Sequence, residues 1–394
     1  MRVLLAPDCF TGTLTARQAA EALAEGWARH APGDALELCP LSDGGPGFTD
    51  VLASTLPGRV LSLAVPGPLG EPAPATVVLT DDATDGVPTA YVESAQACGL
   101  HLVPVPARDP GRTTTAGLAA LLTAARAAGA RRVVVGLGGS GTNDAGAGLL
   151  AGLAGDLVPP GVAARLTGGG AALRGMTAAD LAWLPALRDR WAGLDLVAAS
   201  DVDVPLLGLQ GASAGFAAQK GATPEQAQAL EGCLADLAIA AGEALGLDRR
   251  AGSPPAAAAA PGAGAAGGLG FALALLGARR TPGASSVLAA VGFADRLRRA
   301  DLVVTGEGRF DWQSLRGKVV AAVAHAALDV GTPVVVVAGQ VEVGRREALA
   351  IGVEAAYPVA QTPAEVTAAL ADPHGTLAAR AARVARTWSP RPPG

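Results

Sequence analysis

The sequence predicts an α/β protein built on parallel sheets, because short apolar runs alternate with Ala- and Leu-rich helical segments along most of the chain. Five runs have the length of a strand and no polar alternation, which is typical of strands covered by helices on both faces: residues 2–7, 130–138, 194–200, 300–306 and 333–339. Helices are expected to begin at Thr15, Thr223 and Thr362. Each of these threonines is followed three residues later by a Gln or Glu that can cap in return.

The chain has 394 residues, which is long enough for two domains. Residues 58–93 break the alternation, because their extended, turn-rich segments have no helix between them and predict an antiparallel section. A second change in composition lies at residues 252–268, which are rich in Ala, Pro and Gly. We therefore predict crossings between domains near both segments, with one domain formed by 1–58 and 285–394 and an inserted α/β domain at 59–284.

Composition and charge exclude several classes of protein. The net charge of −5 gives no electrostatic reason to expect a nucleic acid or an anionic membrane as partner. The four cysteines have no C-x-x-C spacing, so we interpret them as reduced apolar residues. No stretch reaches the roughly 20 apolar residues of a spanning helix, and the apolar start is too short for a signal peptide. A cytoplasmic protein with a small-molecule substrate is expected.

Polar side chains follow the apolar runs at their carboxyl ends, where parallel α/β sheets bind ligands. Turn formation and helix capping explain any one of these loops, since Asp, Asn and Gly favour both. Five such loops together favour one acidic site for Mg²⁺ and a phosphate-bearing substrate, because carboxylates suit a hard divalent cation. The loops contribute Asp8, Asp43 to Gly45, Ser140 to Asp144, Asp201 with Asp203, and Glu307 to Asp311.

Few basic residues are placed to hold an anion. Lys220 lies in a Gly-flanked loop, and Lys318 lies at the expected start of a helix, whose N-terminus favours anions. The Gly-rich stretch 136–148 follows a strand and opens a helix, so its backbone N–H groups can cradle phosphates. Residues 262–267 spell G-x-G-x-x-G but follow no strand. An NAD-dependent hydroxy-acid oxidoreductase is therefore only an alternative.

Seven motifs resemble, in order, those of the bacterial glycerate kinases that phosphorylate the 2-hydroxyl: "APDCFTGTLTA", "PLSDGGPGF", "GLGGSGTNDAGAG", "SDVDVPLLG", "GASAGFAAQKGA", "PGAGAAGGLG" and "DLVVTGEGRFDWQSLRGK". The resemblance runs from residue 1 to about 360. It implies phosphorylation of D-glycerate by ATP with Mg²⁺, giving 2-phosphoglycerate. It also implies a flavodoxin-like parallel-sheet domain formed by both chain ends, with an inserted α/β domain.

The resemblance and the strand-end positions select the same side chains. Catalytic roles are predicted for Asp8, Asp43, Asp203, Lys220, Arg309 and Asp311. Contacts with ATP are predicted for Gly138, Gly139, Ser140, Thr142, Asn143, Gly264, Gly267, Glu307 and Lys318. Mg²⁺ is assigned to Asp201 and Asp203. Either Asp8 or Asp43 is expected to accept the proton of the glycerate hydroxyl, with Arg309 and Lys220 holding the substrate carboxylate and the γ-phosphate.

The chain departs from the motifs of this family at several positions. The family has "APDSFKGSL" and "DGGEGT", where this chain has Cys9, Thr11, Pro46 and Phe48, and Val204 replaces an Asn. A relative that kept the fold but lost turnover could show such changes. A catalytically degenerate ligand-binding protein is therefore the second alternative.

The joint loss of a Lys and a Glu, at Thr11 and Pro46, suggests that the two form an ion pair in the family. A partly exposed pair contributes only about 0–1 kcal/mol, so Thr11→Lys with Pro46→Glu should be nearly neutral in glycerate turnover. Pro46→Glu alone should lower turnover, because it adds a negative charge near the phosphates. Steady-state kinetics of the three variants test this. An increase of orders of magnitude in kcat for Thr11→Lys alone would instead make that lysine catalytic.

Overall fold

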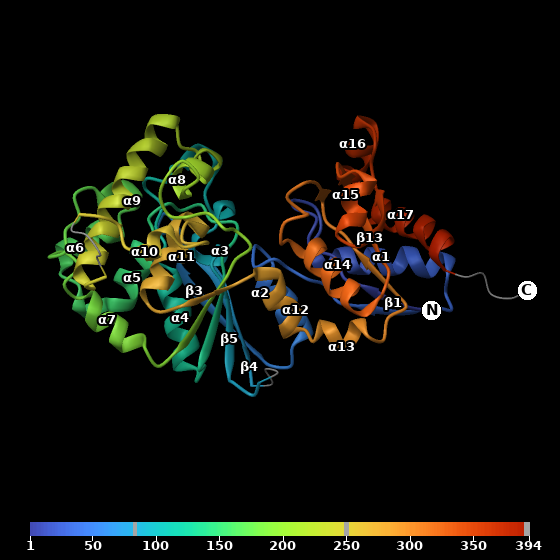
Figure 1. The fold of residues 1–394 in the computed structure, drawn as a ribbon, viewed down its shortest axis with the longest axis horizontal. Coiled ribbons are helices and arrows are strands. Elements are labelled where there is room, and N and C mark those ends of the chain that lie inside the picture. The colour runs from blue at the N-terminus through green and yellow to red at the C-terminus, as the bar shows by residue number, and fades with distance from the viewer. Residues whose placement is uncertain (82–84, 248–251, 390–394) are drawn as a thin grey trace, which may run out of the picture. The chain divides into compact units, whose positions relative to one another are not determined.

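The computed structural model describes residues 1–81, 85–247 and 252–389, which form two compact units (Figure 1). The first unit contains Met1–Asp43, Asp50–Leu56 and Pro282–Gly394, of which residues up to 389 are described. The second contains Gly44–Thr49 and Pro57–Thr281, apart from 82–84 and 248–251, which lie outside the described residues. Both units are therefore discontinuous in sequence, and the first uses both ends of the chain.

The boundaries between the units differ from those expected from composition. Gly44–Thr49 belong to the second unit, because the N–H groups of Gly47 and Thr49 donate to Glu93 Oε2 at 3.1 and 3.3 Å. The second crossing lies at Thr281–Pro282, three residues before the predicted boundary at 284–285 and beyond the 252–268 segment that suggested it. The boundary lies there because Arg279–Thr281 form a strand of the second unit. Ser200 N–H donates to the carbonyl of Thr281 at 2.9 Å.

The first unit contains a five-stranded parallel sheet in the order β2-β1-β9-β11-β13. Counted within the unit this is 2-1-3-4-5, the order of flavodoxin-like folds. Its strands are β1 (Arg2–Leu5), β2 (Ala35–Leu38), β9 (Leu302–Thr305), β11 (Val334–Ala338) and β13 (Val353–Pro358), and a short parallel pair adds β10 (Arg309–Phe310) and β12 (Gln340–Val341). Its helices are α1 (Ala16–His30), α12 (Gly283–Ala290), α13 (Phe293–Leu297), α14 (Val319–Val330), α15 (Arg345–Ala350), α16 (Pro363–Ala371) and α17 (Pro373–Trp388).

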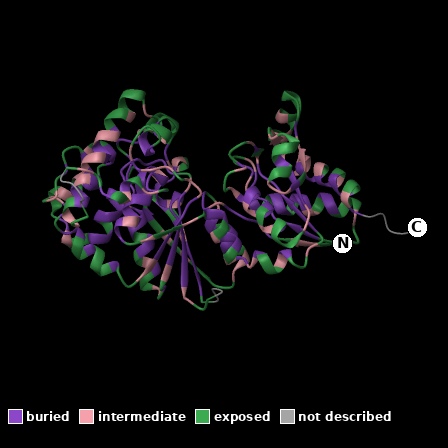
Figure 2. Cartoon of the chain, viewed as in Figure 1, coloured by how far each residue is buried: buried purple, intermediate pink, exposed green. Residues whose placement is uncertain are grey.

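The three central strands of this sheet, β1, β9 and β11, are buried on both faces, as their unbroken apolar runs predict (Figure 2). Val3 and Leu5 of β1 belong to a core cluster with residues of α1 and α17, while Leu4 between them is also buried. Helices α1 and α17 cross closely at Gly26. A Cβ there would lie 1.9 Å from the carbonyl oxygen of Ala378, so a larger residue would force the two helices apart.

The second unit contains a mixed six-stranded sheet in the order β3-β4-β5-β6-β7-β8. The strands are β3 (Arg59–Pro66), β4 (Pro72–Thr80), β5 (Thr89–Glu93), β6 (Arg132–Gly136), β7 (Asp195–Ala199) and β8 (Arg279–Thr281). β3, β4 and β5 pair antiparallel, which confirms the prediction for residues 58–93, and β5 to β8 pair in parallel. The five strands expected from the apolar runs are β1, β6, β7, β9 and β11.

Helices of the second unit cover this sheet and surround a core of Ala, Val and Leu. They are α3 (Ala95–Cys98), α4 (Leu118–Ala127), α5 (Ala147–Ala154), α6 (Pro160–Leu166), α7 (Leu184–Trp191), α8 (Ala212–Phe216), α9 (Pro224–Ala244), α10 (Ala256–Ala259) and α11 (Ala265–Leu275), while α2 (Phe48–Thr55) begins in this unit and continues in the first. Capping boxes are present at Thr15, Thr223 and Thr362, as predicted. Within the described residues, no helix is long and apolar enough to cross a membrane.

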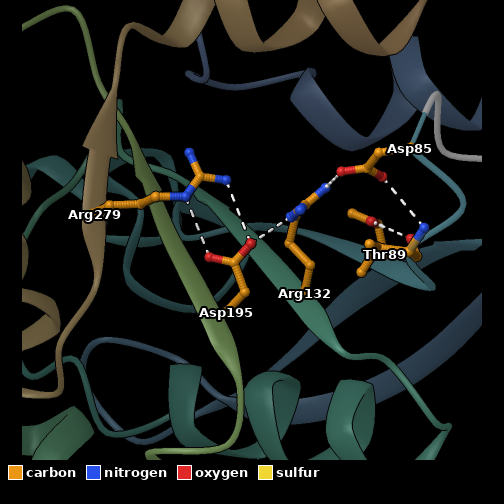
Figure 3. A network of polar contacts seen from close by, with 6 residues as sticks. Asp85, Thr89, Arg132, Asp195 and Arg279 are labelled. Atoms are coloured by element: carbon orange, nitrogen blue, oxygen red, sulfur yellow. Dashed lines mark hydrogen bonds and ion pairs between the residues drawn. The ribbon is translucent and has the colours of Figure 1, made fainter.

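An ion-pair network joins the amino ends of three strands in the second unit (Figure 3). Arg132 Nε of β6 lies 2.6 Å from Asp195 Oδ2 of β7, and Arg279 Nε of β8 lies 3.2 Å from Asp195 Oδ1. A second nitrogen of Arg132 lies 2.6 Å from Asp85. Burial alone would raise the pKa of Asp195, but the hydrogen bonds from both arginines outweigh it and lower that pKa.

Arg132→Met should lower the free energy of unfolding by about 1–2 kcal/mol, because it leaves Asp195 without its shortest charged hydrogen bonds. The pKa of Asp195 is lowered, so its contribution to stability is complete near neutral pH and disappears as the pH falls below about 4. Urea unfolding of the variant and the parent protein, near neutral pH and below about pH 4, measures this difference in the free energy of unfolding. Arg17→Met, which removes an exposed pair with Glu21, is the control and should cost less than about 0.5 kcal/mol.

Candidate active-site residues in the two units

The first unit places three acidic residues at the carboxyl ends of neighbouring strands. Asp8 follows β1, Asp43 follows β2 and Glu307 follows β9. β1 and β9 are adjacent and lie where the strand order reverses, which is where such sheets bind ligands. Asp8 N–H donates to the carbonyl of Gly306 at 2.8 Å, which ties the two strand ends together.

The electrostatics of these acids show that they interact. Burial, the charge of Asp43 and the charge of Glu307 raise the pKa of Asp8 well above its ordinary value. Burial raises the pKa of Glu307 to about 7, opposed by Ser314 and Lys318. In the described part of the chain, the buried Oε1 of Glu307 has no hydrogen-bond partner. The structure thus brings the predicted residues Asp8, Asp43 and Glu307 into one acidic group.

Of the other predicted residues of the first unit, Asp311 and Lys318 act electrostatically on Glu307, whereas Arg309 lies at the surface. Asp311 Oδ1 accepts a hydrogen bond from Gln313 N–H at 2.8 Å, so this carboxylate orders the turn after β10. Lys318 is the N-cap residue of α14, and its charge opposes the raised pKa of Glu307. Arg309 is exposed and lies 3.6 Å from Glu342.

The second unit contains a loop, residues 138–143, with unpaired backbone donors. Gly141 N–H donates to the carbonyl of Cys98 at 2.8 Å. The backbone N–H groups of its five other residues have no acceptor within hydrogen-bond distance among the described residues. Unpaired N–H groups of successive residues form a concavity that attracts anions. Phosphate binding by this loop stays a prediction.

Lys220 lies beneath this loop rather than beside a substrate. Its side chain is only 2% exposed, and its Nζ donates to Ser140 Oγ at 3.0 Å and to the carbonyl of Thr142 at 2.7 Å. Burial lowers the pKa of Lys220 to about 8. Two of its three N–H donors therefore hold the loop, and a direct contact of Lys220 with the γ-phosphate stays a prediction.

The end of the loop is held by the buried side chains of Asn143 and Asp144, whose partners the sequence did not single out. Asp144 Oδ2 accepts from the N–H and the hydroxyl of Thr115, at 2.8 and 2.9 Å. Asn143 Nδ2 donates to Ser213 Oγ at 3.0 Å. Glu93, at the end of β5, holds Gly44–Thr49 as described above. Glu93 could have been selected from the sequence by its position at the end of a strand. Nothing in the sequence pattern identified Thr115 or Ser213 as partners.

The structure does not show a metal site at Asp201 and Asp203. The Asp203 side chain is 78% exposed and one of its oxygens lies 2.6 Å from Arg280. Asp201 is partly buried and has other interactions. Across residues 1–81, 85–247 and 252–389, no three His, Cys, Asp or Glu side chains meet in a geometry that could hold a metal ion. Metal binding by this pair stays a prediction.

The glycines predicted to contact a nucleotide have two kinds of environment. A Cβ at Gly264 would lie 2.2 Å from the carbonyl oxygen of Pro205, and one at Gly267 would lie 1.9 Å from that of Thr142. Close packing of backbone therefore explains both glycines, and no strand leads into them as a dinucleotide fold requires. Gly138 and Gly139 instead face the Gly45–Pro46 segment. A Cβ at Gly138 would lie 2.5 Å from Gly45 Cα, and one at Gly139 would lie 2.6 Å from Pro46 Cγ.

The departures from the family motifs have mostly local explanations. Phe48 is fully buried, and its ring meets Tyr91 edge-on at 6.0 Å. The Val204 carbonyl accepts from Gly264 N–H at 2.9 Å, a contact that any residue can make. Thr11 and Pro46 are exposed and belong to different units, so the ion pair proposed for the family stays a prediction.

Comparisons with known proteins agree with the motifs. The model of the glycerate kinase family matches residues 3–389. The chain belongs to the glycerate kinase family. It is 39% identical over 360 residues to the glycerate kinase of Bacillus subtilis, covering 91% of this chain and 90% of that protein. It is 34% identical over 341 residues to the glycerate 2-kinase of Escherichia coli, covering 86% and 85%.

A solved structure supports the same fold. The crystal structure of a candidate glycerate kinase 2 from Salmonella typhimurium LT2 superposes with a TM-score of 0.76 at 34% identity, and covers 98% of each chain. Membership of the glycerate kinase family makes this chain a kinase of a small molecule. The oxidoreductase alternative has no support, since its only basis was the glycine segment explained by packing.

Glu307→Gln should stabilise the enzyme without ligand at pH 8 by on the order of 1–3 kcal/mol. The pKa of Glu307 is about 7 in the folded protein and near 4.3 when unfolded, so the folded state binds more protons between these values and stability falls as pH rises. Thermal unfolding from pH 5 to 8 measures the slope, which the variant should reduce. Glu21→Gln, an exposed carboxylate on α1, is the control. If the stability of Glu307→Gln fell with pH as steeply as that of the parent enzyme, the pH dependence would not arise from Glu307.

Proposed function

We propose that this protein transfers the γ-phosphate of ATP to the 2-hydroxyl of D-glycerate, giving 2-phosphoglycerate. Membership of the glycerate kinase family supports the reaction class, and the name of the Escherichia coli relative supports the position of transfer. The observation in this structure that carries the proposal is the 138–143 loop, whose unpaired N–H groups suit the phosphates of a nucleotide.

The residues of the first unit fit a Mg²⁺ ion. Asp43 and Glu307 supply only oxygen donors, which Mg²⁺ prefers, and the buried Oε1 of Glu307 has no partner among the described residues. The raised pKa of Glu307 reflects burial and repulsion from Asp311 and Asp43, which a divalent cation relieves. Mg²⁺ binds through one or two carboxylates plus substrate phosphates, so a complete protein cage is not required. When bound, the ion neutralises charge on the transferred group.

Phosphoryl transfer depends mainly on positioning and charge neutralisation, and each proposed role follows from that. Asp8 or Asp43 accepts the proton of the glycerate hydroxyl. Asp8 is favoured, because burial and repulsion make it a stronger base than an exposed carboxylate. The exposed Arg309 is free to turn from Glu342 toward the carboxylate of glycerate. Loop 138–143 holds the nucleotide phosphates, with Lys220 beneath it.

The test is a coupled assay of ADP release with D-glycerate and ATP–Mg²⁺, followed by phosphorus NMR of the product. We expect turnover that stops when EDTA removes the metal, and a signal from a phosphate on C2. A panel of other small hydroxy acids tests the acceptor. Binding of glycerate with no ADP release would favour the degenerate ligand-binding alternative, and activity undiminished by EDTA would contradict the role of Mg²⁺.

The proposed base is tested by Asp8→Asn, which should lower kcat at least ~10²-fold, the scale seen when transition-state electrostatics are lost. The matched control is Asp301→Asn. Asp301 accepts a hydrogen bond from Arg2 N–H at the opposite end of the same sheet, so its replacement should leave kcat unchanged. Equal kcat values in both variants would move the base elsewhere.

A further inference from the structure

The hydrogen-bonding roles at Lys220 and Ser140 are fixed by chemistry. A lysine ammonium has three donors and no acceptor, so Ser140 Oγ must accept the 3.0 Å hydrogen bond from Lys220 Nζ. The serine hydroxyl then has its own hydrogen to donate. No acceptor for that hydrogen lies within reach among the described residues, although Ser140 is only 7% exposed. A buried hydroxyl without an acceptor indicates an absent partner.

The charge of Lys220 also lacks a direct counterion. No carboxylate of the described residues lies within 4.0 Å of its Nζ. The acid whose charge acts on it is Asp144, but the oxygens of Asp144 already accept from Thr115, Gly146 and Gly148. A buried charge is stable only when it is paired, so an anion is expected close by.

We propose that Ser140 Oγ–H is a direct contact for a phosphate group of the nucleotide, and that Lys220 acts through this hydroxyl as a positioning residue. The inference rests on the proposed function, since it names the nucleotide as the anion. Ser140 lies within loop 138–143, so its hydroxyl adds a donor to the unpaired backbone N–H groups. The ammonium polarises the hydroxyl and strengthens its hydrogen bond to an anion.

The variants separate this role from general stability. Ser140→Ala removes the donor, and Ser94→Ala is the matched control. Ser94 is also a buried serine of the same unit, and its hydroxyl donates to the carbonyl of Gly136 at 2.7 Å, outside the loop. Calorimetric titration with ADP, in the absence of glycerate, measures affinity without turnover. Thermal unfolding of both variants measures folding.

We expect Ser140→Ala to weaken ADP binding roughly tenfold to a hundredfold, the value of one hydrogen bond to a charged group. Ser94→Ala should retain the affinity of the parent enzyme, whatever its effect on Tm. Ser140→Thr, which restores a hydroxyl, should recover most of the affinity. Equal ADP affinity in Ser140→Ala and Ser94→Ala would overturn the proposal.

The pH dependence gives a readout that a merely structural role would not move. ADP affinity should fall as the pH rises through about 8, where Lys220 loses its charge. The facing groups are Asp144, whose pKa burial raises, and Cys98, whose pKa burial raises to about 12, so Cys98 stays neutral there. In Ser140→Ala this fall should be smaller. A slope equal to that of the parent enzyme would contradict the route through Ser140.

The failure of this proposal can be distinguished from the failure of the proposed function. ADP titration needs no acceptor, so loss of affinity in Ser140→Ala supports the phosphate contact even if glycerate proves to be the wrong substrate. Conversely, glycerate turnover with an ADP affinity that ignores Ser140 would support the function and reject the contact.

Discussion

The buried carboxylate of Asp144 determines the shape of the second unit's site. It lies at the carboxyl end of β6 and accepts hydrogen bonds from backbone N–H groups on both sides, at Thr115 and at Gly146. These bonds join the start of α5 to the segment before α4. The preceding loop can then leave its own N–H groups unpaired, because its course is fixed from below by Lys220 and at its end by Asp144. An anion site that is formed before binding needs less reorganisation when the ligand arrives.

The first unit supplies a different kind of group. Burial and neighbouring negative charges raise the pKa of both Asp8 and Glu307, which lowers the stability of the folded protein at neutral pH. Burial raises the pKa of Asp144 too, but there hydrogen bonds from Thr115, Gly146 and Gly148 oppose the shift. The two units therefore contribute different kinds of group. One supplies strained carboxylates that suit a cation and a base, and the other supplies backbone donors that suit phosphates.

The sequence predicted most of the fold, because the signals concerned were local. Apolar runs identified β1, β6, β7, β9 and β11, and the capping boxes at Thr15, Thr223 and Thr362 identified helix starts. Strand ends correctly selected Asp8, Asp43 and Glu307 as a group. Sequence could not show that Lys220 points into a loop or that Asp203 is an exposed partner of Arg280, because both depend on residues distant in the chain. The predicted boundary at 284–285 lies three residues after the observed one at Thr281–Pro282, whose exact place depends on the pairing of β8 with β7.

The discontinuity of the first unit has a consequence for biosynthesis. β1 pairs with β9, and the hydroxyl of Thr305 donates to the carbonyl of Ala6, which lies 299 positions earlier in the chain. A nascent chain emerges N-terminus first, so β1 has no partner on that side until β9, at Leu302–Thr305, has been translated. The second unit, by contrast, is almost continuous between Pro57 and Thr281 and can form its sheet earlier. The edge of β1 that pairs with β9 must meanwhile stay unpaired, so a slowing of translation before β9 extends the time during which this edge is exposed to aggregation.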